Sequence, residues 1–353
     1  MSSSVGAGRN IPIPRRFSVA KAAAGQMGKR RSVARARGSR VPWKLVGGIA
    51  GAAAALGAAA LFNRIASERA ESDNPPAGDF IDVDGVRLHY LRRGQGSPIL
   101  LLHGNGATSE DMVASGLVDR LARSHLVIVP DRPGYGHSDR PRGRIWHPRR
   151  QAELMLGLID RLGLENPVVV GHSWGALVSV ALALAAPKRV RGLVLLSGYY
   201  YPTARLDVPL LSGPAVPVLG DLVAHTVSPL LARAITPAFL KRIFQPLPVD
   251  PRFRARFPLD LALRPSQIRA SAEETAYMVP AAAALSRRYG ELDLPIVIMA
   301  GDGDRIADLQ RQSVRLHEEL ATSALAIVPG AGHMIQYAAT EAIARAAESL
   351  AEP

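Results

Sequence analysis

A strand, a tight turn and a helix are encoded together by Val168-Val169-Val170-Gly171-His172-Ser173-Trp174-Gly175-Ala176-Leu177. The β-branched apolar run predicts a buried strand, and the Ala- and Leu-rich run predicts a helix. A serine in the Gly-x-Ser-x-Gly pattern between them projects its hydroxyl out of the turn, since the flanking glycines carry no Cβ atoms that could collide. The free N–H groups at the start of the helix would stabilise negative charge that develops beside Ser173.

Short apolar runs on both sides of this turn predict further buried strands, and helical patterns separate several of them. These runs cover residues 98–102, 126–129, 190–196, 295–300 and 324–328. Continuous apolar strands that alternate with helices are typical of a mostly parallel sheet covered by helices on both faces. Residues 80–91 differ, because apolar alternation flanks Asp84-Gly85, a strong hairpin signal. We therefore expect the folded domain to open with two antiparallel strands.

One connection between predicted strands is too long to be a loop. Residues 199–290 are rich in proline and contain two helical patches, so they indicate an inserted helical cap within a core formed by residues 80–198 and 291–353. The insertion leaves the sheet at its carboxyl edge, where open α/β folds bind ligands. Tyr199 and Tyr200 open the insertion, which makes them candidates to line a substrate pocket, although tyrosines are equally common at ordinary domain junctions.

Candidate partners for Ser173 follow the last two predicted strands. A serine hydroxyl at neutral pH needs a base, and the base needs an orienting carboxylate. Asp302 and Asp304 come directly after residues 295–300, and His333 comes shortly after the final strand. Because the carboxyl ends of parallel strands meet at one edge of a sheet, an acid and His333 can converge on Ser173. The spacing alone leaves both aspartates open as the acid.

Five segments, in order along the chain, resemble motifs of the α/β-hydrolase superfamily, particularly its branch of capped esterases, haloperoxidases and C–C hydrolases. They are His103-Gly104-Asn105-Gly106, the Asp-x-Pro-Gly-x-Gly-x-Ser-Asp segment at residues 131–139, the turn at residues 171–175, Gly301-x-x-Asp304 and Gly332-His333. The resemblance covers residues 80–350. It implies the α/β-hydrolase fold, with a mostly parallel sheet, helices on both faces and a helical cap insertion.

The resemblance also implies a role for individual residues. Ser173 would be the nucleophile, His333 the base and Asp304 the acid, with Asp302 as the alternative acid. By the same resemblance, the backbone N–H groups of Asn105 and Trp174 would form the oxyanion hole.

Further motif residues are expected to have structural roles rather than catalytic ones. Asp131 precedes the nucleophile and is therefore out of the expected order. His103, His137 and His172 are likewise interpreted as structural supports.

These assignments predict a serine hydrolase that cleaves carboxylic esters through an acyl-enzyme intermediate. The apolar composition of the cap favours a small-molecule substrate with a hydrophobic acyl group or a lipid-like ester. The alternative is hydrolysis of a C–C bond in a diketone-type substrate, which uses the same triad. A non-catalytic binding protein of this fold is less favoured, because all three triad positions are filled. The mechanism requires no cofactor and no metal ion.

The amino-acid composition bears on which reactive groups and which partners the protein can have. The chain of 353 residues contains no cysteine, which excludes disulfide scaffolding and thiol nucleophiles. Its formal net charge is +13, but residues 1–44 hold 11 of the 43 Lys and Arg residues and no Asp or Glu. The remaining residues carry 32 basic and 30 acidic side chains, so the body is close to neutral. No nucleic-acid partner is expected, because aromatic residues for base stacking are scarce in the basic tail, which we expect to be disordered.

An 18-residue stretch without any polar side chain follows this tail, at residues 45–62. As a helix it would span roughly 27 Å, close to the hydrocarbon thickness of a bilayer. We interpret it as a transmembrane signal anchor, with residues 63–79 as a linker to the domain; a cleaved signal peptide and a soluble linker are the alternatives. Basic residues before the span predict a single-pass protein with a cytoplasmic N-terminus and an extracytoplasmic, periplasmic catalytic domain. The alternative location is the cytoplasm.

Overall fold

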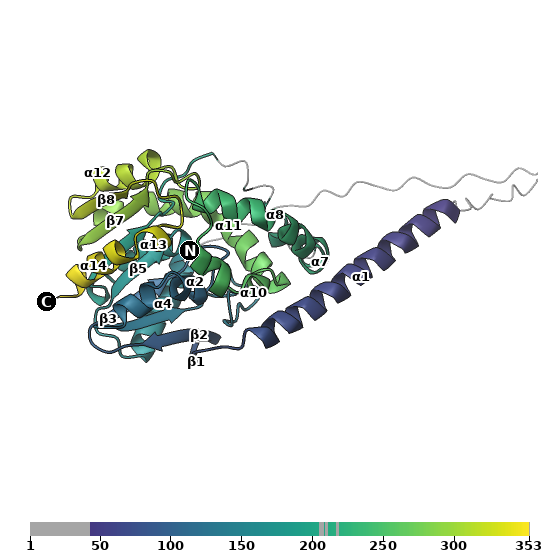
Figure 1. The fold of residues 1–353 in the computed structure, drawn as a ribbon, viewed down its shortest axis with the longest axis horizontal. Coiled ribbons are helices and arrows are strands. Elements are labelled where there is room, and N and C mark those ends of the chain that lie inside the picture. Colours follow the sequence, from purple (N-terminus) through teal and green to yellow (C-terminus); the bar gives the residue numbers. More distant parts are fainter. Residues whose placement is uncertain (1–42, 205–207, 209–210, 217–218, 353) are drawn as a thin grey trace, which may run out of the picture. The chain divides into compact units, whose positions relative to one another are not determined.

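The computed structural model describes residues 43–204, 208, 211–216 and 219–352. Eight strands form one sheet in the order β1-β2-β4-β3-β5-β6-β7-β8 (Figure 1). The strands are β1 (Asp79–Val83), β2 (Val86–Arg93), β3 (Pro98–Leu102), β4 (Leu126–Pro130), β5 (Val168–His172), β6 (Gly192–Leu196), β7 (Ile296–Gly301) and β8 (Ser323–Val328). Each run that was predicted to be a strand is a strand, so these predictions are confirmed.

The first two strands form the expected hairpin. Asp84 and Gly85 connect β1 to β2 and have φ angles of 51° and 70°, the left-handed conformations that a tight two-residue hairpin turn requires. Strand β2 also pairs with β4 in the antiparallel sense. The six strands β4, β3, β5, β6, β7 and β8 run parallel to one another. The sheet is therefore mostly parallel, as predicted.

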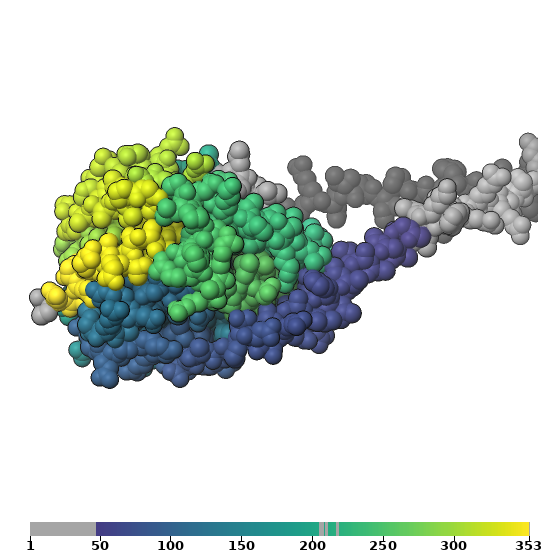
Figure 2. Space-filling view, viewed as in Figure 1, coloured from purple at the N-terminus to yellow at the C-terminus, as the bar shows by residue number. Residues whose placement is uncertain are grey.

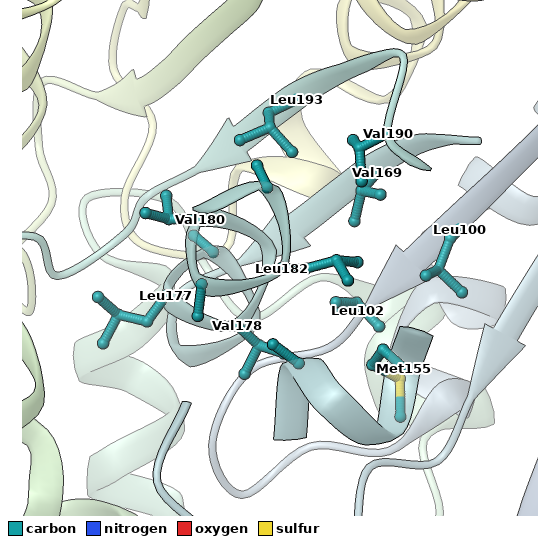
Figure 3. Packing of buried hydrophobic residues seen from close by; sticks show 14 of the residues in the cluster. Leu100, Leu102, Met155, Val169, Leu177, Val178, Val180, Leu182, Val190 and Leu193 are labelled. Atoms are coloured by element: carbon teal, nitrogen blue, oxygen red, sulfur yellow. The ribbon is translucent and has the colours of Figure 1, made fainter. Parts of the chain in front are cut away.

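Alternate side chains along the strands supply two separate cores. Leu100 and Leu102 pack on one face of the sheet with α4 (Pro148–Arg161) and α5 (Trp174–Ala185). Figure 3 shows this layer, in which Met155 and Leu182 approach the two strand leucines. Ile99 packs on the opposite face of the sheet, which is covered by α3 (Leu117–Leu121) and α14 (Thr340–Ala351). Both faces are buried, which explains why the parallel strands are continuous apolar runs.

Shorter helices and helical turns lie in the core, apart from Gly213–Ala215 in the segment between β6 and β7 and Tyr289–Glu291 at the end of that segment. They are α2 (Ser109–Ala114), α12 (Arg315–Glu319), α13 (Ile335–Ala338), the 3-10 turns Pro187–Arg189, Gly213–Ala215 and Tyr289–Glu291, and the π-helical turn Gln310–Val314.

A helical insertion separates β6 from β7. Its helices are α7 (Leu219–His225), α8 (Val227–Phe244), α9 (Pro251–Arg256), α10 (Leu259–Ala262) and α11 (Pro265–Ser286). Figure 2 shows these green segments packed against both the blue and the yellow parts of the core. Phe244 and Phe253 of the insertion belong to one buried cluster with Met334 and Tyr337 of the core. The insertion is thus fixed to the core by apolar packing.

Helix α1 spans Trp43–Asp73 and is therefore longer than the expected apolar segment at residues 45–62. Residues 63–73 of the predicted linker are helical, and the i,i+4 ion pairs Arg64–Glu68 and Arg69–Asp73 support this extension. From Gly47 onward the helix is long and apolar enough to cross a membrane, and little of it is buried in protein. The predicted disordered tail, apart from residues 43 and 44 at the start of α1, lies outside the described residues.

A buried ion pair ties the insertion to the core. Arg132, in the loop after β4, binds Glu274 of α11 through both terminal nitrogens, and both side chains are fully buried. Gln151 of α4 accepts from Arg132 at 2.8 Å and donates to Glu274 at 2.8 Å. Removal of one partner would leave an uncompensated buried charge, which commonly costs about 3–5 kcal/mol.

We therefore predict that Glu274→Gln lowers the free energy of unfolding by about 3–5 kcal/mol. The matched control is Glu273→Gln, one residue earlier on α11, where the partly exposed carboxylate pairs with Arg140 and Arg269. Its substitution should cost about 1 kcal/mol or less. Denaturant unfolding of the full-length protein in detergent measures both values. Equal losses for the two variants would contradict a special role of the buried pair.

A second buried carboxylate belongs to α2 and is bound by two side chains of α13. Asp111 accepts from the Tyr337 hydroxyl at 2.9 Å and from the Gln336 amide at 2.9 Å. Burial raises the pKa of Asp111 to about 6, although these two hydrogen bonds oppose the rise. Between pH 4 and pH 6 the folded protein thus holds a proton at Asp111 that the unfolded chain has released. The stability that this group contributes falls as the pH rises through that window.

Asp111→Asn, which cannot ionise, should therefore stabilise the protein relative to the unsubstituted chain at pH 7 but not at pH 4. The gain is limited to about 1.4 kcal/mol for each pH unit between the folded and unfolded pKa values. Thermal unfolding at several pH values measures it, and the same substitution at exposed Asp119 controls for loss of a charge. A difference that does not vary with pH would show that Asp111 is not the titrating group.

Candidate active site

Ser173 lies in a strained turn at the carboxyl end of β5. Its φ angle is 52° and its ψ angle is −112°, a conformation that costs a residue other than glycine about 1–3 kcal/mol. The Ser173 N–H group donates to the Leu196 carbonyl of β6 at 2.8 Å, which fixes the turn to the sheet. The residue is only half-buried, so the turn presents its side chain to incoming molecules.

Close backbone packing explains the two glycines of the turn. A Cβ atom on Gly171 would overlap the Ser179 hydroxyl, and one on Gly175 would overlap the Leu102 carbonyl. Strand and helix can approach this closely only when both positions lack a side chain. The expected physical reason for the Gly-x-Ser-x-Gly pattern is therefore met in the structure.

His333 and Asp304 converge on Ser173 from neighbouring strand ends. The Nε2 atom of His333 lies 3.0 Å from the Ser173 Oγ atom, and its Nδ1 atom lies 2.8 Å from Asp304 Oδ2. The other oxygen of Asp304 accepts backbone N–H bonds from Ile306 at 2.7 Å and Ala307 at 3.0 Å. This chain of bonds can carry the serine proton to the imidazole while the carboxylate fixes the orientation of the ring.

The surroundings of Asp304 keep its carboxylate ionised. Burial alone would raise its pKa, but the charge of His333, its hydrogen bond and the two backbone N–H bonds together lower the pKa below the ordinary value. An ionised Asp304 favours the His333 tautomer that carries its proton on Nδ1. The Nε2 atom is then free to accept the proton of Ser173.

Asp302, the alternative acid, is placed elsewhere. Its Oδ1 atom accepts the Gly330 N–H group at 2.7 Å, so it caps the turn that precedes His333. The imidazole bonds to Asp304 instead. The two carboxylates of the same turn thus have different partners, and Asp304 is the one that contacts the imidazole.

The backbone N–H groups of Asn105 and Trp174 are available as donors. Trp174 is the first residue of α5, and neither N–H group has a protein acceptor among the residues that the structure describes. The loop that carries Asn105 lies against the nucleophile, because a Cβ atom on Gly104 would lie 3.3 Å from Ser173 Cβ. Two free donors beside the serine hydroxyl can stabilise an oxyanion.

Arg132 holds this loop in place. Its Nε atom donates to the His103 carbonyl at 2.8 Å, and a terminal nitrogen donates to the Gly104 carbonyl at 2.8 Å. From the insertion, the Ser271 carbonyl accepts the side-chain amide of Asn105 at 3.2 Å. The ion pair with Glu274 thus continues into the loop with the candidate oxyanion donors. Sequence reasoning missed both charged residues, because no local pattern in the sequence marks either of them.

Two other histidines near the site are neutral supports. Burial lowers the pKa of both His103 and His172 to about 3. His103 Nε2 accepts the Arg132 backbone N–H group at 3.0 Å, and His172 Nε2 lies 3.0 Å from the His333 carbonyl. They position the loops on either side of the serine, as expected from the sequence.

Asp131 also has a structural role. Its carboxylate accepts from Ser109 N–H at 2.8 Å and His137 N–H at 3.0 Å, and it lies 2.7 Å from His89 Nδ1. These bonds join the loop after β4 to α2 and β2.

The two tyrosines that were predicted to line a pocket are buried where the insertion begins. The Tyr199 hydroxyl accepts the Thr203 N–H group at 2.8 Å. Tyr200 packs within the larger core cluster, and its N–H group donates to Gln312 at 2.7 Å. Their place in a substrate pocket stays a prediction. Within residues 43–352, the described positions include no group of three or more His, Asp or Glu side chains that could hold a metal ion.

Comparisons with known proteins agree with this architecture. The family model described as "alpha/beta hydrolase fold" matches residues 97–340. A 2-hydroxymuconate semialdehyde hydrolase from Pseudomonas putida is 31% identical over 296 residues, which cover 79% of this chain and 96% of the relative. A 2-hydroxy-6-oxo-2,4-heptadienoate hydrolase from Pseudomonas putida is 27% identical, over 74% of this chain and 92% of the relative.

A solved structure leads to the same family. The crystal structure of an alpha/beta hydrolase fold protein from Burkholderia ambifaria has a TM-score of 0.63 and 25% identity, over 77% of this chain and 97% of that chain. The predicted resemblance and the predicted fold class are confirmed. The chain belongs to the α/β-hydrolase superfamily.

Proposed function

We propose that this protein is a serine hydrolase in which Ser173 is the nucleophile, His333 the base and Asp304 the orienting acid. The observation that carries the proposal is the unbroken chain of contacts at 3.0 and 2.8 Å that joins the three side chains. In this mechanism His333 takes the proton of Ser173 as the hydroxyl attacks a carbonyl carbon. The N–H groups of Asn105 and Trp174 bind the resulting oxyanion. Collapse of this intermediate breaks the bond to the leaving group, which takes the proton from His333, and leaves the acyl group on Ser173. Water activated by His333 then releases the acyl group as a carboxylic acid.

For the substrate, we propose a conjugated ketone or aldehyde in which the C–C bond next to the carbonyl group is cleaved. In this reaction water adds across the bond: the acyl side becomes a carboxylic acid, and the carbon leaving group takes a proton. The leaving carbanion must be stabilised by conjugation, as in a 2-hydroxy-6-oxo-dienoate. Support comes from the two Pseudomonas putida relatives, whose names specify such compounds and whose lengths this chain covers almost fully. From the sequence alone, hydrolysis of a C–C bond is the alternative prediction to ester hydrolysis.

Carboxylic ester hydrolysis, our first expectation, remains the second candidate. The same triad and oxyanion donors suit an ester carbonyl without change. The observation that favours it is the exposed apolar surface of α8 in the insertion, since esters with hydrophobic acyl groups or lipid-like esters would partition near such a surface.

We also propose that α1 anchors the protein in a membrane. Within Gly47–Asp73 the helix contains an apolar window long enough to cross a membrane, and little of that window is buried, which distinguishes it from a core helix. The basic residues before it favour a cytoplasmic N-terminus and a catalytic domain on the far side of the membrane. A cytoplasmic protein is the alternative.

The substrate proposal predicts a specific order of activities. Full-length protein in detergent should hydrolyse 2-hydroxy-6-oxo-2,4-heptadienoate with a higher kcat/KM than p-nitrophenyl esters of two to eight carbons. Ser173→Ala should lower both activities by at least about 1,000-fold, because the nucleophile is lost. Loss of dienoate absorbance and release of nitrophenolate measure the two rates.

A higher kcat/KM on the esters would reverse the order of the two candidates. If the folded Ser173→Ala variant kept its activity on every substrate, Ser173 would not be the nucleophile.

A pair of substitutions in one turn separates the two candidate acids. Asp304→Asn should lower kcat by about 10,000-fold, because an amide at this position favours the wrong tautomer of His333. Asp302→Asn, two residues earlier, should leave kcat close to that of the unsubstituted protein, since its carboxylate caps a turn. Because the pKa of Asp304 is lowered, its effect on kcat should persist in mildly acidic buffer. A larger loss in Asp302→Asn would overturn the assignment.

A further inference from the structure

Exposed apolar side chains of this protein are concentrated in two places. Among the described residues, sixteen large hydrophobic side chains are exposed, and thirteen of them lie either on α1 or between residues 211 and 239. We define the α7–α8 apolar face as Leu219 and Leu222 of α7 with Val227, Leu231, Ile235 and Phe239 of α8. Each of these six side chains is between 42% and 61% exposed. Scattered single residues of this kind are ordinary, whereas a contiguous set indicates an interaction surface.

The four residues of α8 form one continuous stripe. Val227, Leu231, Ile235 and Phe239 follow one another at intervals of four residues, so they lie on the same side of the helix. Thr236 and Ile243, on another side, are buried against the protein. The helix is therefore apolar both toward the core and toward its surroundings, and only the inner side is covered.

The α7–α8 apolar face adjoins the helix that we propose as a membrane anchor. Asn63, the first polar residue after the apolar run of α1, donates through its side-chain amide to the His225 carbonyl at 3.0 Å and the Thr226 carbonyl at 2.7 Å. These two carbonyls form the junction between α7 and α8, and Asn63 is 1% exposed. The end of the apolar run of α1 is thus hydrogen-bonded to the junction between α7 and α8, next to the α7–α8 apolar face.

A cation–π contact between α8 and α1 lies close to this junction. The guanidinium group of Arg233 on α8 lies 6.0 Å from the ring centroid of Phe62 on α1. Figure 1 shows α7 and α8 close to the part of α1 that approaches the domain.

The charges near this face suit a lipid surface. Helix α8 contains three basic residues, Arg233, Lys241 and Arg242, and no acidic residue. The one carboxylate of α7, Asp221, is paired with Arg142 at 3.0 Å and with Arg269 at 3.1 Å. Helices that lie in the membrane interface combine an apolar side with basic residues in this way. Unpaired carboxylates, which anionic lipid headgroups would repel, are absent from both of these described helices.

We propose that the α7–α8 apolar face lies on the bilayer that α1 spans, with its apolar side chains among the acyl chains. This inference goes beyond the proposed reaction, and it rests on the proposed anchor. Since α1 brings the bilayer surface to Asn63, the neighbouring apolar side chains need no additional partner to be covered. The insertion then has a lipid-contacting side in addition to the side that packs on the core.

Because the chain contains no cysteine, single labels can be introduced cleanly. Leu231→Cys and Ile235→Cys carry a nitroxide spin label in full-length protein reconstituted into vesicles of phosphatidylcholine and phosphatidylglycerol. Ile49→Cys reports on α1, and Ile327→Cys, at an exposed position of β8, is the matched control. Power saturation of the continuous-wave EPR signal measures how often each label collides with two reagents. Oxygen is concentrated in the bilayer, and a nickel chelate is confined to water.

We expect the labels at positions 231 and 235 to shift, as at position 49, toward collision with oxygen, while the label at 327 collides mainly with the nickel chelate. If positions 231 and 235 behaved like 327 while 49 reported lipid, the proposed face would be wrong and the anchor would stand. If position 49 also reported water, the anchor itself would be wrong. Labels at 231 and 235 that are shielded from both reagents, with dipolar broadening that grows with protein density, would identify a second copy as the occupant and overturn the lipid proposal.

Discussion

The left-handed backbone of Ser173 is the constraint on which the rest of the site depends. A residue with φ of 52° is stable there only because the surrounding packing leaves it no alternative. The Leu196 carbonyl fixes its N–H group, and Gly171 and Gly175 allow the helix and the neighbouring strand to close around it. The free energy that maintains this strain comes from the two apolar layers on either side of the sheet, so the core and the reactive group are parts of one arrangement.

The remaining parts of the site are held by contacts between residues far apart in the sequence. His333 is positioned at its backbone as well as at its ring, since its N–H group donates to the Ile243 carbonyl at the end of α8. The loop with Asn105 is held by Arg132, which in turn is held by Glu274 of α11. Helices of the insertion thus support both the base and the candidate oxyanion donors. The insertion is part of the site and not only a cover for it.

Local patterns were sufficient to predict the strands, the turn at Ser173 and the positions of the acidic residues and His333 after two strand ends. Each depends on signals within about ten residues, such as apolar runs and the glycines that flank a turn. The choice between Asp302 and Asp304 required the resemblance to a family, because both follow the same strand. The pair of Arg132 and Glu274 could not be found, since 142 residues separate them and neither has a local signature. The extension of α1 to Asp73 was missed because polar composition was interpreted as a linker, although ion pairs four residues apart also support a helix.

The burial of Arg132 and Glu274 affects how substrate can enter the site and how product can leave it. To swing α11 away from the core, the protein would have to expose or separate a fully buried pair of opposite charges, at a cost of several kcal/mol. A state with α11 displaced would therefore be sparsely populated at equilibrium. Helix α11 is therefore held against the core in nearly all molecules. A path for substrate through parts of the insertion without a buried charge pair would avoid that cost, and we expect substrate and product to use such a path.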